Sequence, residues 1–124
     1  VVNKSDMKLE QVQSHKDLIV WQKAIDLVED IYEVTAKLPS DERYGLVSQM
    51  RRAAVSIPSN IAEGHRRSSN KDSLRFMNIA YASGAELETH IEIIKRLKYR
   101  TSENAESLLE EVVKMLNKIC SKAF

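Results

Sequence analysis

Apolar residues recur every three or four positions through most of this chain, and few residues are available to interrupt that spacing. Only three Gly and two Pro occur among 124 residues. The last stretch is the clearest, because its apolar positions alternate steps of four and three: Ala105, Leu109, Val112, Leu116, Ile119 and Ala123. Such alternation is typical of helices that pack along a seam. The pattern therefore favours a few long helices joined by short loops.

We predict four helices, over residues 16–37, 41–63, 69–98 and 101–122. Pro39 ends the first helix, Ser40 is placed to cap the second, and Gly64 is a suitable terminator for it. Long amphipathic helices with short connections favour an antiparallel up-down-up-down four-helix bundle. The expected fold class is all-α, with residues 15–124 forming one domain. Residues 1–14 are polar and weakly patterned, and we expect a flexible leader there.

The first predicted helix carries more apolar surface than a single bundle needs. Trp21 and Tyr32 lie beside two aliphatic rows, whereas a lone bundle covers one side of each helix. Surplus apolar surface usually marks a partner site, and head-to-tail contacts that close into a ring are one way to cover it. We therefore expect a homo-oligomer in which the first helix contributes to the contact.

The third predicted helix combines a wide apolar side with a narrow waist. Ile79, Ile93 and Leu97 are expected to broaden its buried side. Gly84 lies mid-helix, where glycine costs about 1 kcal/mol relative to alanine. We expect that Gly84 makes room for a neighbouring backbone or for a large side chain such as Trp21.

Pro58 interrupts an otherwise regular helical pattern in the second helix. It lacks an N–H and crowds the carbonyl of Ala54, at a cost of roughly 3 kcal/mol in a helix interior. We predict that the second helix is bent near Pro58. Arginine pairs flank this segment, Arg51 and Arg52 before it and Arg66 and Arg67 after it.

The segment around Pro58 also carries a family resemblance. Residues 51–67, and in particular Ser-Ile-Pro-Ser-Asn-Ile-Ala-Glu-Gly over 56–64, resemble the signature of the 23S rRNA-intervening-sequence protein family, also called the four-helix-bundle protein family. Supporting segments follow in order on both sides, at residues 17–24, 39–46, 75–80 and 86–89. The match covers about residues 16–99, which is most of the chain.

The resemblance implies a four-helix bundle that assembles as a homopentamer around a central channel. Related members resemble accessory proteins of diversity-generating retroelements, so RNA, DNA or a nucleic-acid enzyme such as a reverse transcriptase is the implied partner. One set of residues is assigned to the oligomer interface or to a structural motif: Trp21, Tyr32, Pro58, Asn60, Glu63 and Glu86. For Glu86 two interpretations stay open, a bond to Arg or Tyr of a neighbouring helix and a pair with Arg of another subunit.

The sequence offers little for catalysis or metal binding. Its histidines are His15, His65 and His90, and the nearest metal-like pair, Glu86 with His90, has i,i+4 spacing. A di-metal bundle instead needs two Glu-x-x-His motifs with further carboxylates. Cys120 has no His close in sequence, and Ser and Gly form no nucleophile elbow or phosphate loop. We therefore expect neither an enzyme nor a cofactor.

Basic residues are the remaining functional signal. The formal net charge is only +1, so an argument for nucleic-acid binding depends on where the charges lie. If the second and third helices are antiparallel neighbours, the positive residues around their connection gather at one end of the bundle. The predicted nucleic-acid-binding residues are Arg51, Arg52, Arg66, Arg67, Lys71 and Arg75. The alternative is that these are solvated surface charges.

A single cysteine and the absence of a long apolar run favour a cytoplasmic protein with no membrane partner. Two hypotheses on function follow from the observations above. The leading hypothesis is a non-enzymatic, ring-like homo-oligomer that acts as a nucleic-acid-binding or accessory module. The alternative is a structural oligomer that scaffolds a protein partner and has no role with nucleic acid.

Overall fold

The computed structural model of the chain describes residues 14–122, and the rest of the predicted leader, residues 1–13, lies outside this range. Within the described part, four α-helices follow one another: α2 (Ile19–Ala36), α3 (Ser48–Arg66), α4 (Asn70–Arg96) and α5 (Glu103–Lys122). Short helical turns lie at His15–Asp17 (η2), Ser40–Glu42 (η3) and Arg43–Val47 (η4). The all-α fold class is confirmed.

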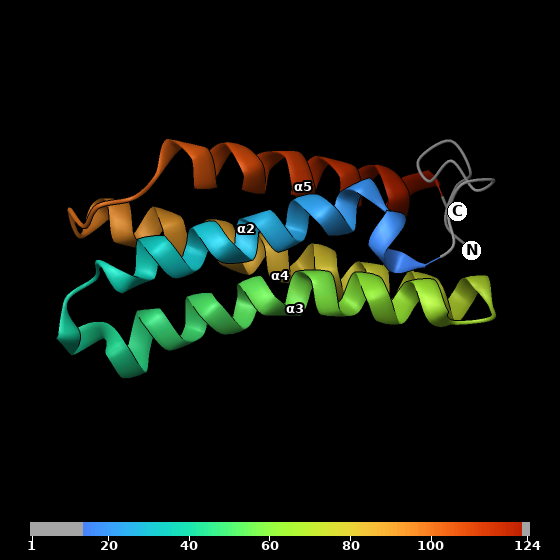
Figure 1. Cartoon of the computed structure of the whole chain (residues 1–124), viewed down its shortest axis with the longest axis horizontal. Helices are drawn as coiled ribbons and strands as arrows, with labels where there is room; N and C mark the ends of the chain where they lie inside the picture. The colour runs from blue at the N-terminus through green and yellow to red at the C-terminus, as the bar shows by residue number, and fades with distance from the viewer. Residues whose placement is uncertain (1–13, 123–124) are drawn as a thin grey trace.

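The helices form an antiparallel bundle in the predicted order. In Figure 1 each helix runs opposite to the one before it, so the chain crosses the length of the molecule four times. α3 packs against α2 and α4, and α5 closes the bundle by packing against α2 and α4. The contact between α3 and α4 is the most extensive of these. The connection between them comprises only Arg67, Ser68 and Ser69, and brings the end of α3 beside the start of α4.

Each helix contributes a fully buried row to one core. Leu27 and Ile31 come from α2, Met50 and Ile57 from α3, and Leu87 from α4, all with no exposed surface. α5 buries the seam that its sequence predicts: Ala105, Leu109, Val112, Leu116 and Ile119. The wider apolar side predicted for α4 is only partly covered, because Ile79, Ile93 and Leu97 remain 40%, 39% and 50% exposed.

The start of the second helix differs from the prediction. Regular α3 begins at Ser48, and the segment before it winds as a 3-10 turn and then as a π-helical turn. The Ser40 side chain makes no capping bond, since Pro39 is the N-cap residue of the first turn. The carboxylate of Glu42 instead accepts a hydrogen bond of 2.9 Å from the hydroxyl of Tyr99, which follows α4. This contact joins the α2–α3 connection to the α4–α5 connection at the same end of the bundle.

Gly64 does not end the second helix, which continues to Arg66. A Cβ atom at Gly64 would lie 3.0 Å from the backbone oxygen of Ser73 and 3.2 Å from Met77 Cε on α4. Gly64 therefore allows the two backbones to approach closely. At Gly84 the predicted close approach is present, but the neighbour is Val113 of α5, whose Cγ2 would lie 2.8 Å from an added Cβ, rather than Trp21.

Candidate nucleic-acid interface

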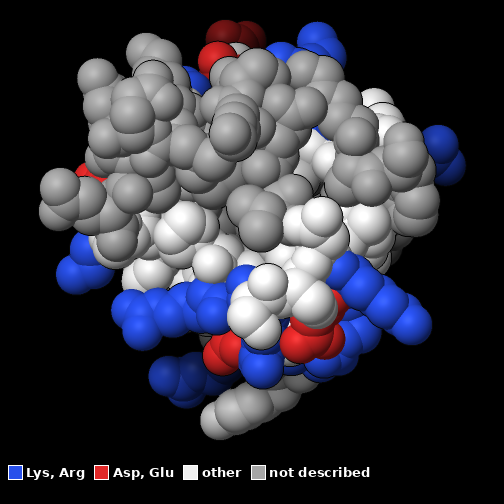
Figure 2. Space-filling view, turned by 90° about the vertical axis from the view of Figure 1, so that its right-hand side faces the viewer, with Lys and Arg blue, Asp and Glu red and all other residues white. Residues whose placement is uncertain are grey.

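Four of the predicted nucleic-acid-binding residues meet at the connection between α3 and α4. Arg66 is the last residue of α3, Arg67 follows it, and Lys71 and Arg75 lie in the first turns of α4. We call these four residues the basic turn. Ser69 caps α4 by accepting a hydrogen bond of 3.2 Å from the backbone N–H of Asp72. Figure 2, which views this end of the molecule, shows cationic side chains gathered along its lower part with acidic ones between them.

Two of the four cations are held by carboxylates. Arg67 Nη2 donates to Glu63 Oε2 at 2.7 Å, one helical turn earlier, and Arg67 Nε lies 4.0 Å from Asp72 Oδ2. Arg75 Nη2 lies 3.2 Å from Asp72 Oδ1. These pairs are exposed to solvent, so each contributes little to stability. Their effect is to fix the two guanidinium groups and to neutralise much of their charge.

Phe76 further orders these two arginines. The guanidinium carbon of Arg67 lies 4.6 Å from the centre of the Phe76 ring, and that of Arg75 lies 4.4 Å from it. Both distances are within the range of a cation–π interaction. Because two guanidinium groups contact this ring, it is poorly available to stack on a nucleic-acid base. The arrangement suits contact with phosphate rather than base recognition.

Arg66 and Lys71 carry the charge that remains. Both residues are exposed, and neither forms an ion pair with any residue in the range 14–122. His65 adds no charge near neutral pH. Burial first, and then the nearby His15 and Arg66, lower the pKa of His65 below its ordinary value of 6.5. The unneutralised charge of the basic turn therefore lies on Arg66 and Lys71.

Arg51 lies away from the basic turn. Fifteen residues separate it from Arg66, which corresponds to about 22 Å along a helix. Its Nε donates to Thr35 Oγ1 at 2.8 Å and its Nη2 to the carbonyl of Tyr32 at 3.3 Å. Its guanidinium carbon lies 4.3 Å from the centre of the Tyr32 ring. Arg51 thus joins α3 to α2.

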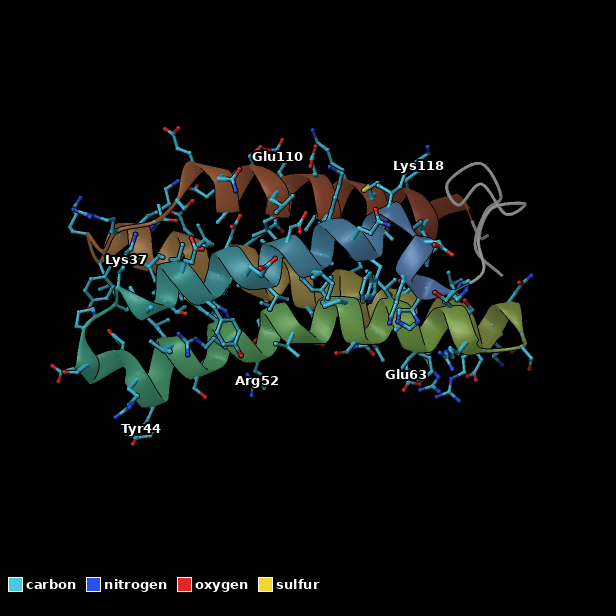
Figure 3. The ribbon with its side chains drawn as sticks, in the orientation of Figure 1. Lys37, Tyr44, Arg52, Glu63, Glu110 and Lys118 are labelled. Atoms are coloured by element: carbon cyan, nitrogen blue, oxygen red, sulfur yellow. The ribbon has the colours of Figure 1, made fainter. Side chains whose placement is uncertain are left out.

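Arg52 points away from the bundle in Figure 3, well apart from Glu63 on the same helix. Its Nη2 lies 3.4 Å from Glu86 Oε2 on α4, and His90 Nε2 lies 3.5 Å from that same oxygen. Glu86 therefore pairs with an arginine of the neighbouring helix, which is one of the two interpretations left open by the sequence. The Arg52 side chain is 71% exposed, so the pair is weak in water.

Pro58 is buried inside α3, and the helix continues through it. Proline cannot donate to the carbonyl of Ala54, and the residue after it adds a side-chain hydrogen bond to the next carbonyl along the helix. The Ser59 hydroxyl donates to the carbonyl of Val55 at 2.8 Å. The bend that we predict at this residue stays a prediction.

Asn60 connects the same turn to α4. Its Nδ2 donates to the carbonyl of Ser56 at 2.8 Å and contacts the Ser56 hydroxyl at 3.0 Å. The Ser56 hydroxyl in turn lies 2.9 Å from that of Ser83 on α4. The polar residues of the Ser-Ile-Pro-Ser-Asn string thus make a hydrogen-bonded network between two helices of one chain.

Exposed large apolar side chains lie on several elements of the described part: Ile19 and Tyr32 on α2, Tyr44 before α3, Val55 on α3, and Ile79, Ile93 and Leu97 on α4 and at its end. Trp21 packs partly against the core and meets the ring of His15 edge-on at 5.2 Å. Tyr32 is 42% exposed, but Arg51 contacts its ring. Ile79 and Ile93 on α4, and Leu97 directly after it, are comparably exposed. A shallow hollow beside Ile93 is also lined by Thr89 and Arg96.

The described residues contain no group of three or more His, Cys, Asp or Glu side chains that could hold a metal ion. None of the described helices is both long and apolar enough to cross a membrane. Burial raises the pKa of the Cys120 thiol above its ordinary value, which opposes formation of the reactive thiolate.

Sequence reasoning missed the parts played by Asp72 and Phe76. Neither residue was among the site residues predicted from the sequence. The signal was available in part, since Asp72 and Arg75 have i,i+3 spacing. The contact of both residues with Arg67 depends on how the short connection folds, and residue spacing does not determine that.

The fold and the site together define the class of this protein. It is an antiparallel four-helix bundle with a basic turn between its two middle helices. The chain matches the 23S rRNA-intervening sequence protein family over residues 16–121. This protein belongs to that family, which confirms the resemblance drawn from its sequence.

A solved structure of similar fold comes from Bacteroides thetaiotaomicron. It is a protein with unknown function from the S23 ribosomal protein family, 27% identical in sequence, with a TM-score of 0.73. The similarity covers 83% of this chain and 96% of that one. No curated protein matches the sequence.

Proposed function

We propose that this protein is a non-enzymatic, homo-oligomeric helical bundle that binds nucleic acid as an accessory module. The observation that carries the nucleic-acid assignment is the pair of unneutralised cations, Arg66 and Lys71, beside two arginines fixed by Asp72 and Phe76. Fixed and exposed cations at one end of a rod can neutralise phosphates without reading sequence. Membership of a family named for an intervening sequence of ribosomal RNA supports RNA as the ligand.

The basic turn predicts a specific salt dependence. Replacing both Arg66 and Lys71 by Gln should weaken retention on structured RNA at every sequence tested. It should also make the plot of log affinity against log salt less steep. The magnitude of its negative slope should fall by about 1.4 to 1.8, because each lost phosphate contact contributes about 0.7 to 0.9. The measurement is a titration of fluorescent RNA at several salt concentrations.

The matched control replaces Arg96 and Lys114 by Gln. Both are exposed cations paired at i,i+4 with Glu92 and Glu110, so the net charge changes equally. This control should keep the slope of the unmodified protein. Equal slopes for the two double variants would contradict the assignment of the basic turn.

The oligomeric part of the proposal rests on three exposed apolar residues on α4 and at its end. A second copy of the chain would bury Ile79, Ile93 and Leu97, which the bundle leaves in water. A pentameric ring is the arrangement that the family resemblance implies. Light scattering of dilute protein tests this part, since the mass of one chain would contradict it.

The same apolar residues favour the alternative, a scaffold for a protein partner without any role for nucleic acid. Neutralisation of Arg67 and Arg75 by acids within the chain is consistent with that alternative. A gel-shift panel of structured RNA and duplex DNA at low salt separates the two. Complete absence of binding would support the scaffold.

A further inference from the structure

A hollow of about 500 Å³ lies where α2 ends and α3 begins, at the opposite end of α3 from the basic turn. Its polar lining comprises two arginines and three hydroxyl groups, from Thr35, Ser40, Arg43, Ser48 and Arg51. None of the described residues that line it is acidic. Small-molecule sites typically have volumes of about 300–1,000 Å³, so this hollow is large enough for a ligand.

Arg51 brings a fixed positive charge to the wall of this hollow. Its two hydrogen bonds go to the Thr35 hydroxyl and the Tyr32 carbonyl, and its guanidinium contacts the Tyr32 ring. All three partners are neutral, so the guanidinium is held in place while its charge remains available. A cation that is already ordered loses less conformational entropy when it binds an anion.

Arg43 supplies a second cation at the rim. It is exposed, and among the described residues it forms no ion pair. The hydroxyl groups of Ser40 and Ser48 make no hydrogen bond within the described part of the chain. The nearby acid Glu42 does not line the hollow, and its carboxylate accepts a hydrogen bond from Tyr99.

We propose that this hollow binds the phosphate group of a phosphomonoester of about nucleotide size. Two guanidinium groups and two hydroxyl donors match the several acceptor oxygens of a terminal phosphate. The remaining lining includes Leu38, Pro39 and Val47, which offer apolar contact to the body of such a ligand. Such a phosphate belongs either to a free nucleotide or to the 5′ end of an RNA chain. The site is independent of the basic turn.

The test is a titration of the full chain, labelled with nitrogen-15, with three probes: adenosine 5′-monophosphate, inorganic phosphate and adenosine. Amide signals of Ser40, Arg43 and Ser48 should shift with both phosphate-bearing probes and not with adenosine. A 5′-phosphorylated RNA oligomer and its 5′-hydroxyl counterpart then distinguish the two sources. A preference for the phosphorylated oligomer over the nucleotide assigns the RNA end, and the reverse preference assigns the free nucleotide.

Substitutions locate the site. Arg43→Gln should weaken binding of adenosine 5′-monophosphate about tenfold, the effect expected for one charge-assisted contact. Arg51→Gln should weaken it at least as much, and its thermal melting must be followed because Arg51 also joins two helices. The matched control, Arg52→Gln, removes the adjacent arginine, which does not line the hollow.

Arg43 is exposed, so its variant keeps the test valid even if Arg51→Gln fails to fold. Equal binding by Arg43→Gln and the unmodified protein would overturn the proposal, as would equal binding of adenosine and its monophosphate. The R66Q/K71Q variant should bind adenosine 5′-monophosphate normally, which separates failure of this site from failure of the basic turn.

Discussion

His90 lies in surroundings that oppose the charged form of its side chain. It is 5% exposed, and within the described range its Nδ1 has no hydrogen-bond partner. Burial is the largest influence and lowers the pKa of His90 below its ordinary value of 6.5, although the carboxylate of Glu86 partly offsets this. A neutral imidazole is therefore favoured in the folded bundle, and the unfolded chain takes up a proton more readily.

This difference predicts how stability depends on pH. Well above pH 6.5 the histidine is neutral in both states, and its contribution to the free energy of unfolding is constant. As the pH falls below 6.5, protonation of the unfolded chain lowers that free energy, because the folded pKa is the lower one. His65 acts in the same direction. Urea denaturation at intervals between pH 7.5 and 5 measures the slope.

The substitution His90→Gln should reduce this slope, since one of the two responsible groups no longer titrates. His65→Gln is the companion variant, and it should remove the other part. A free energy of unfolding that rises as the pH falls through this range would contradict the assigned direction.

At the scale of the element, the contact between α3 and α4 depends on small residues. Gly64→Ala should destabilise the protein by about 1–3 kcal/mol, because its Cβ would lie 3.0 Å from the backbone oxygen of Ser73, which cannot move freely. Gly45→Ala is the matched control, since its Cβ would meet only Glu42 Oε1 at 3.6 Å. It should instead stabilise by about 0.4–1 kcal/mol through the unfolded chain. Urea denaturation of both variants checks the opposite signs.

The helices were predictable to different degrees. α5 follows from its sequence because alternate steps of four and three specify one buried seam, and all described members of that seam are buried. The start of α3 did not follow, because the Glu42–Tyr99 bond joins residues 57 apart in the chain. Gly64 was assigned to a helix end because glycine is common there, whereas its actual role depends on the distance to a second helix.

The candidate site was predictable in location but not in charge balance. Antiparallel neighbours bring Arg66, Arg67, Lys71 and Arg75 together, as the sequence indicated. Which of these cations stay unneutralised depends on side-chain geometry around Asp72 and Phe76. The roles of all these residues with nucleic acid stay predictions.

At the scale of the whole molecule, the position of the exposed apolar surface predicts how copies associate. Ile79→Asp combined with Ile93→Asp should reduce the mass in solution, because a charge would be buried in the contact between copies. The matched control is Ile19→Asp on α2, where the native residue is 42% exposed, close to the 40% and 39% of the α4 pair. Light scattering at equal protein concentration compares the variants. An unchanged mass for the α4 double variant would place the contact elsewhere.

The three-residue connection between α3 and α4 also bears on the order of folding. Closing so short a loop loses little chain entropy, whereas joining α2 to α5 requires the two distant parts of the sequence to meet. We expect the α3–α4 hairpin to form in the folding transition state and α5 to dock afterwards. We therefore expect kinetic φ-values near one around Ser56 and Ser83 and near zero at Leu116. The reverse distribution would exclude this order of folding.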